Sequence, residues 1–152
     1  MNKTLNYYFE LYLPKIIGIV VGVYFYFHPT NKFMFDDTFF DKILVFSTTL
    51  FGFLLAVLTL LIQSNSKTVE ALKEAKAFPR LIVANKHVVY LSGMLALLSL
   101  LIISVNEIWM VSKLGLLKLF ASFSVSILII LIIDTTIFLI IFYRIILNDA
   151  RK

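Results

Sequence analysis

Apolar residues occur in four blocks along the chain, and charged residues are concentrated between these blocks and at the two ends. The blocks cover residues 11–27, 43–62, 88–105 and 119–143. About 20 mostly apolar residues are needed for a helix that crosses a hydrocarbon core about 30 Å thick. The first block is the shortest, and we expect Pro14 and Lys15 to lie in its first helical turn near the headgroups. The pattern predicts an all-α integral membrane protein with four transmembrane helices in a single domain, residues 1–152.

Composition agrees with this class of protein and removes several others. Hydrophobic residues make up 61% of the chain and charged residues 15%, which is more apolar surface than a soluble domain of 152 residues could bury. Cysteine is absent, the two histidines have no metal-ligand spacing, and no glycine-rich phosphate loop occurs. We therefore expect no enzyme activity, no metal and no cofactor. The lipid bilayer is the expected environment, and no direct contact with nucleic acid is expected.

The distribution of lysine and arginine predicts the orientation. Ten of these residues lie in the amino-terminal segment, in the polar loop 63–87 and in the tail, and only four lie in the other two loops. The four are Lys32, Lys42, Lys113 and Lys118. Because basic loops stay in the cytoplasm, we expect both termini and loop 63–87 to be cytoplasmic.

A short cytoplasmic helix is predicted between the second and third spans, over residues 64–78. Ser64 and Ser66 can cap this helix and Pro79 can end it. Pro79 also suits the first turn of a helix, so the third span can extend backward from residue 88. Its side chains suit contact either with lipid headgroups or with a soluble cytoplasmic regulatory protein, and the sequence leaves both open. The candidate contact residues are Lys67, Val69, Leu72, Lys73, Lys76 and Arg80.

Asp134 is the single acidic residue inside the fourth block, near the middle of the membrane. A carboxylate there costs about 2.5–3.5 kcal/mol on the insertion scale, so it must face protein or water or be protonated. Ser122 and Ser126 precede it at intervals of four through Ile130, which favours one polar ridge. Two interpretations stay open: a pore-lining or proton-accepting stripe, and a protonated aspartic acid that hydrogen-bonds a neighbouring helix.

Small residues recur at intervals of three or four in the other three blocks, which lets helices approach closely in lipid. These lines are Gly18 and Gly22 in the first, Thr48, Gly52, Ala56, Thr59 and Gln63 in the second, and Ser92, Ala96 and Ser99 in the third. Packing within one chain is the ordinary interpretation. An interface between copies, or a pore lined by Thr48, Thr59 and Gln63, is the alternative.

In plan the chain resembles the small four-span membrane components of bacterial anti-phage defence systems of the Hailong and Kiwa type. The likeness lies in the size, the inferred cytoplasmic termini, and the passage LIQSNSKTVEALKEAKAF between the second and third spans. The resemblance implies a homo-oligomeric channel in the bacterial inner membrane that a soluble partner restrains and that depolarises the membrane during infection. The alternative is a non-conducting membrane subunit, either a toxin-immunity protein or an anchor for a cytoplasmic enzyme.

Overall fold

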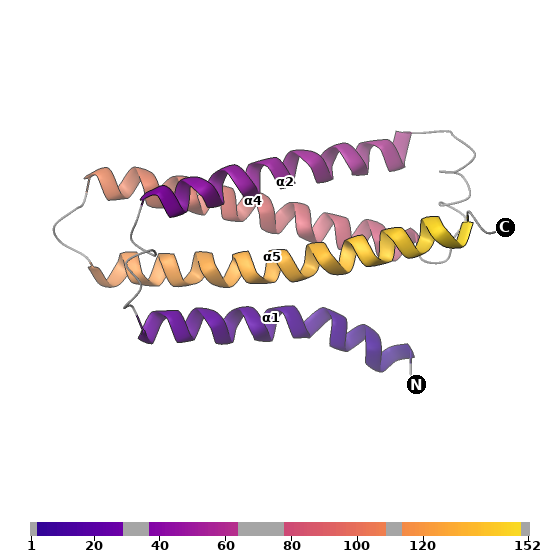
Figure 1. Ribbon diagram of the computed structural model, residues 1–152, viewed down its shortest axis with the longest axis horizontal. Coiled ribbons are helices and arrows are strands. Elements are labelled where there is room, and N and C mark those ends of the chain that lie inside the picture. Colours follow the sequence, from indigo (N-terminus) through magenta and orange to yellow (C-terminus); the bar gives the residue numbers. More distant parts are fainter. Residues whose placement is uncertain (1–2, 29–36, 64–77, 109–113, 150–152) are drawn as a thin grey trace.

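The described part of the chain is entirely helical, apart from one residue after the first helix. The computed structural model describes residues 3–28, 37–63, 78–108 and 114–149. It contains α1 (Lys3–Phe27), α2 (Asp37–Gln63), α4 (Phe78–Ile108) and α5 (Leu114–Asp149). The helices run up and down in turn, so α1 begins and α5 ends at the same end of the molecule (Figure 1). The prediction of an all-α protein is confirmed.

Three of these helices are long and apolar enough to cross a membrane. Their apolar segments are Thr38–Leu60 in α2, Leu81–Ser104 in α4 and Lys118–Arg144 in α5, and α1 has a shorter one, Tyr12–Phe27. Large apolar side chains are exposed on all four helices. Exposure on this scale is unfavourable in water and ordinary in lipid. The helices therefore indicate a multi-pass membrane protein.

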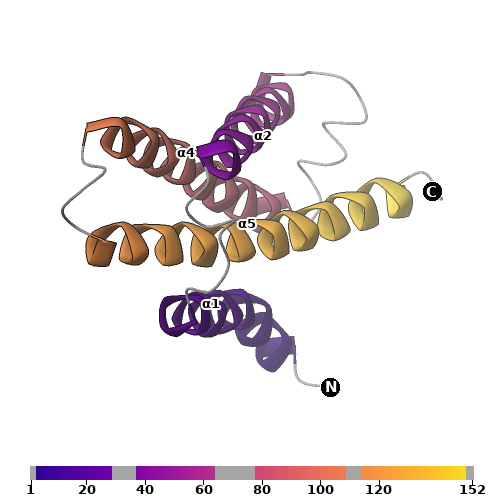
Figure 2. The ribbon, with the colours of Figure 1, turned by 60° about the vertical axis from the view of Figure 1, so that its left-hand side comes forward.

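The helices form an open row and not a closed bundle. Helix α4 packs against both α2 and α5, whereas α1 packs against α5 on the side away from α4. Figure 2 shows the row from α2 through α4 and α5 to α1. Because α1 and α2 are the two ends of the row, each has a broad side that no other described helix covers.

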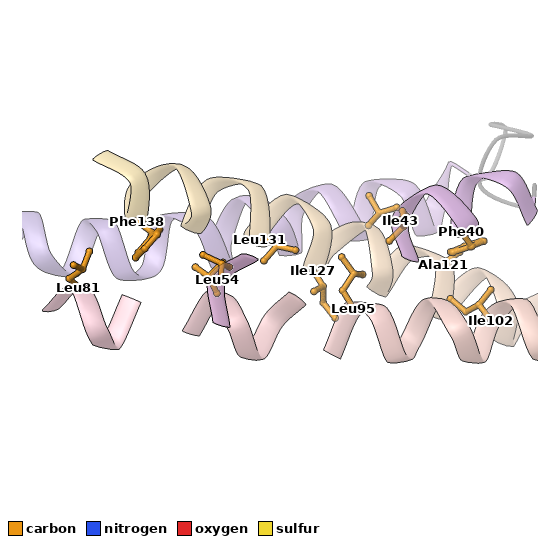
Figure 3. Packing of buried hydrophobic residues seen from close by; sticks show 12 residues of the cluster. Phe40, Ile43, Leu54, Leu81, Leu95, Ile102, Ala121, Ile127, Leu131 and Phe138 are labelled. Carbon is orange, nitrogen blue, oxygen red and sulfur yellow. The ribbon is translucent and has the colours of Figure 1, made fainter. Parts of the chain in front are cut away.

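A heptad-like seam joins α4 to α2. The buried positions of α4 recur at alternating intervals of four and three: Leu81, Asn85, Val88, Ser92, Leu95, Ser99 and Ile102. The facing positions of α2 include Phe40, Ile43, Ser47 and Leu54. Spacing of this kind keeps one helix face toward its neighbour over many turns. Leu54, Leu95 and Leu131 belong to the apolar core that results (Figure 3).

Glycine permits the contact between α1 and α5. A Cβ atom at Gly18 would overlap the Ile130 side chain and lie 2.8 Å from the Ser126 carbonyl oxygen. A Cβ atom at Gly22 would overlap the Ser126 side chain. The Ser126 hydroxyl donates a 2.7 Å hydrogen bond to the Gly18 carbonyl oxygen. The missing side chains on α1 thus let α5 come close enough for a hydrogen bond between helices.

Two helix limits bear on the sequence prediction. The third span is bounded at 88–105 with an extension backward to Pro79 left open, and α4 takes that extension, because it begins at Phe78 and its apolar segment begins at Leu81. Pro14, which the sequence places in a first turn, lies inside α1 because this helix begins at Lys3. Most of the predicted cytoplasmic helix lies outside the described residues, as do Lys67, Val69, Leu72, Lys73 and Lys76. Of Arg80 the structure describes the backbone, in the first turn of α4.

Candidate functional site

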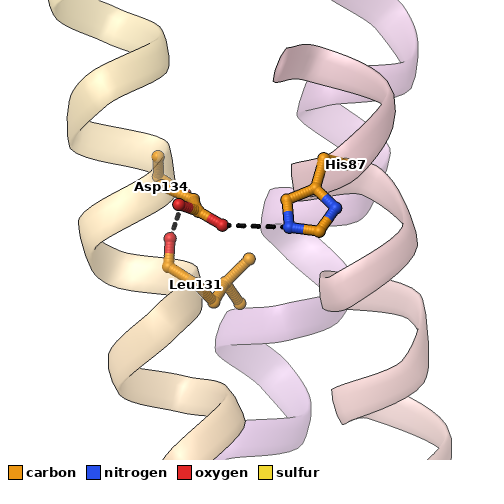
Figure 4. Close-up of polar contacts among 4 residues, drawn as sticks. His87, Leu131 and Asp134 are labelled. Atoms are coloured by element: carbon orange, nitrogen blue, oxygen red, sulfur yellow. Dashed lines mark hydrogen bonds and ion pairs between the residues drawn. The ribbon is translucent and has the colours of Figure 1, made fainter. Parts of the chain in front are cut away.

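Asp134 on α5 faces His87 on α4. The His87 Nε2 atom lies 3.3 Å from Asp134 Oδ2, and Figure 4 shows the two side chains pointing toward each other across the gap between the helices. Asp134 follows buried Leu131 by three residues and precedes buried Phe138 by four. This spacing places its side chain on the face of α5 that packs against α4. The intramembrane acid therefore has a potentially cationic partner on another helix.

Both residues lie within the apolar segments of their helices. His87 follows Leu81 by six residues, which is about 9 Å at 1.5 Å per residue, and Asp134 precedes Arg144 by ten, or about 15 Å. The antiparallel course of α4 and α5 brings these two depths together, nearer the end that holds the chain termini. The sequence places His87 at the end of loop 63–87, next to the third span. In the structure α4 begins at Phe78, so His87 lies within this helix and within its apolar segment.

The two members of the pair differ in exposure. The Asp134 side chain is 14% exposed, whereas the His87 side chain is 40% exposed. The buried Asp134 Oδ2 accepts no directed hydrogen bond in the described part of the chain, although it lies within ion-pair distance of the imidazole. Uncompensated polar groups are costly in a low-dielectric interior. The site is therefore a partly satisfied polar pair with its imidazole at the surface of the helix row.

Asn85 adds a second polar group to α4, two residues before His87. Its side chain is fully buried, and its Nδ2 donates a 3.3 Å hydrogen bond to the Leu54 carbonyl oxygen of α2. Its Oδ1 has no hydrogen-bond partner among the described residues. Neither Asn85 nor His87 lies in the third span as the sequence bounds it, 88–105. The signal for Asn85 is its place on the buried α4 spacing, which continues back to Leu81, whereas His87 lies off this spacing.

The predicted polar ridge of α5 divides between two interfaces. Ser122 and Ser126 face α1, where a Cβ atom at Gly22 would approach both, while Asp134 faces α4. Eight residues separate Ser126 from Asp134, which corresponds to about 80° around a helix at 3.6 residues per turn. Spacing by four therefore rotates the last member of the ridge away from the first.

The small-residue line of α2 lies on the outer surface. Thr48, Gly52, Ala56, Thr59 and Gln63 are all exposed, and a Cβ atom at Gly52 would meet nothing within 4 Å. The hydroxyls of Thr48 and Thr59 donate to the carbonyl oxygens of Leu44 and Leu55, one turn earlier in the same helix. Both hydroxyls find their acceptors within α2 and need no hydrogen bond to another helix. This surface is therefore compatible with lipid or with another copy of the chain.

The corresponding line of α4 lies inside the molecule. Ser92 and Ser99 are fully buried and Ala96 is half-buried. The two serine hydroxyls donate to the carbonyl oxygens of Val89 and Leu95 at 2.9 Å. Small side chains at these positions let the central helix pack closely against its neighbours.

The described residues hold no group of three or more histidine, aspartate and glutamate side chains that could bind a metal ion. The His87–Asp134 pair offers proton exchange, because imidazole and carboxylate side chains take up and release protons. No other ionisable pair is present among the described residues of the spans.

Comparisons with protein-family models, with curated proteins and with solved structures found no match to this chain.

Proposed function

We propose that the protein is an oligomeric ion channel that crosses the membrane four times, with both termini and the chain between α2 and α4 in the cytoplasm. Two features of α1 support its role as the fourth span. It lies antiparallel beside α5 through Gly18 and Gly22, and Ile16, Ile19 and Val20 are exposed as lipid-facing residues would be. An even number of spans agrees with the position of both termini at one end.

The observation that carries this proposal is the His87–Asp134 pair. Ionisable residues inside a membrane are rare, and they usually face a bundle interior or a water-filled cavity and mark ion or proton pathways. The carboxylate here is nearly buried, but the imidazole is 40% exposed on the surface of the helix row. Contact of that surface with lipid is unfavourable, so water or a second copy should cover it. Protons are the ions that such a pair is best suited to transfer.

Assembly of several copies is the second part of the proposal. The seams between the described helices are filled by apolar and small side chains, so a conducting path needs surfaces from more than one copy. The exposed line from Thr48 to Gln63 on α2 offers such a surface. In the channel of this proposal, the chain between α2 and α4 binds the soluble partner that holds the channel closed. Opening depolarises the membrane, as the resemblance to the defence effectors implies.

Ion flux into liposomes tests the proposal. Purified protein is reconstituted, a membrane potential is imposed, and proton flux is followed with a pH-sensitive dye. Asp134→Asn and His87→Gln should each lower the flux by about tenfold, equivalent to about 1.4 kcal/mol in the barrier. Thr136→Val is the matched control, because Thr136 lies at the same depth, is exposed, and donates only to the Ile132 carbonyl oxygen of its own helix.

The competing function is that of a non-conducting membrane subunit, an immunity protein or an enzyme anchor. Under that function His87 and Asp134 would only hold α4 against α5. Folded wild-type oligomers that pass no ions would refute the channel and favour the subunit. Flux that Asp134→Asn and His87→Gln leave unchanged would refute the role of this pair in conduction. Chemical crosslinking of the same liposomes should show oligomers, which Gly52→Leu should reduce because Gly52 lies on the open α2 surface.

A further inference from the structure

An apolar groove runs between α1 and α5 on the outer surface of the helix row. It has a volume of about 390 Å³ and is lined by residues that include Ile19, Val23 and Phe27 of α1 and Leu119, Phe123 and Ile130 of α5. Its surface is almost entirely apolar, and Tyr26, Ser122 and Ser126 are its polar lining residues. Gly22 forms part of the wall, at the place where α1 packs closely against Ser126 of α5.

The length of the groove matches one leaflet of a bilayer. From Phe27 to Ile19 the wall spans eight residues of α1, and from Leu119 to Ile130 it spans eleven residues of α5. At 1.5 Å per residue these stretches are about 12 and 16 Å long. Half of a hydrocarbon core is about 15 Å thick. The groove therefore begins where the apolar segments of both helices end and stops near the middle of the membrane.

A lysine directly precedes the first groove residue of α5. Lys118 begins the apolar segment of α5 and directly precedes Leu119. It is partly exposed and makes no ion pair or hydrogen bond with another described residue. A long basic side chain at the end of a span extends toward the headgroups. An anionic phosphate at that level would complement its charge.

We propose that this groove binds one anionic phospholipid from the leaflet opposite the chain termini. One acyl chain occupies the groove between α1 and α5, and the Lys118 ammonium contacts the phosphate. The bound lipid covers the apolar wall that α1 and α5 share and so stabilises α1, which has its extensive contact with α5 alone. This inference is independent of whether the protein conducts ions.

Photocrosslinking in liposomes tests the site. The liposomes contain phosphatidylglycerol with a diazirine in its acyl chain, and the crosslinked peptides are identified by mass spectrometry. Labelling of residues 19–27 and 119–130 should exceed that of the exposed α2 residues Phe53 and Leu60 several-fold. Equal labelling of all exposed apolar residues would overturn the proposal.

Two matched pairs of variants sharpen the test. Val23→Trp fills the groove and should abolish the excess labelling. Val20→Trp should not, because Val20 lies on the same helix outside the groove. The two residues are similarly exposed, Val23 at 50% and Val20 at 62%. Lys118→Gln should lower the preference for phosphatidylglycerol over phosphatidylcholine about fivefold, the contribution of one lysine near a charged headgroup. Lys42→Gln, near the start of α2, should leave it unchanged. Equal effects within either pair would contradict the site.

Discussion

Replacing Gly18 with alanine should weaken the attachment of α1 to α5. The new methyl group would collide with Ile130 and would lie 2.8 Å from the Ser126 carbonyl oxygen. A carbonyl oxygen of a helix backbone cannot rotate aside, so the two helices must separate by a few tenths of an ångström or more. That movement also strains the 2.7 Å hydrogen bond from the Ser126 hydroxyl to the Gly18 carbonyl oxygen.

The expected magnitude follows from these contacts. Overpacking of this kind costs about 1–3 kcal/mol, and a hydrogen bond between membrane helices contributes about 0.6 kcal/mol. Alanine returns up to about 1 kcal/mol through its higher helix propensity. The free energy of unfolding should therefore fall by about 1–2 kcal/mol in Gly18→Ala.

Unfolding in mixed micelles, with helix content followed by circular dichroism, measures this change. Gly52→Ala is the matched control, because the same substitution on α2 meets nothing within 4 Å. It should leave the protein as stable or slightly more stable, from helix propensity alone. The chain has no cysteine, so spin labels at Val20→Cys and Ile132→Cys report the separation of α1 and α5 directly. Equal stability of the two glycine variants, with no change in the label distance, would refute the reasoning.

Two further predictions concern the polar groups of α4 and α5. A double-mutant cycle with His87→Gln and Asp134→Asn should give a coupling energy of about 0.6 kcal/mol and at most about 1.7, the range found between membrane helices; unfolding titrations measure it, and a coupling near zero would mean that the 3.3 Å contact contributes nothing. Asn85→Leu should change the free energy of unfolding by less than about 1 kcal/mol, because it removes the unpartnered Oδ1 together with the hydrogen bond to Leu54. Asn85→Ala should cost about 2 kcal/mol or more from the cavity that it leaves, and a leucine variant as unstable as the alanine variant would contradict this account.

The parts of the fold that the sequence predicts are those that depend on solvent. A helix that crosses lipid needs a long apolar segment. The limits of the last three apolar blocks therefore agree to within several residues with those of the apolar segments of α2, α4 and α5. Helix limits are predicted less well where polar residues continue a helix out of the apolar region. Residues 78–87 contain Arg80, Asn85, Lys86 and His87 and read as loop by hydropathy, yet their buried positions continue the α4 spacing.

Hydropathy does not predict which face of a helix packs against which neighbour, and the candidate site depends on this packing. Asp134 fits two patterns: it follows Ser126 by two steps of four, and it lies between Leu131 and Phe138 on the apolar seam. The first pattern directs it toward α1 and the second toward α4, about 80° apart. The structure has the second arrangement. Because Gly18 and Gly22 lack side chains, Ser126 packs against α1, and Asp134 then lies on the side of α5 that faces α4. An unremarkable pair of glycines on one helix thus determines which residue meets the carboxylate on another.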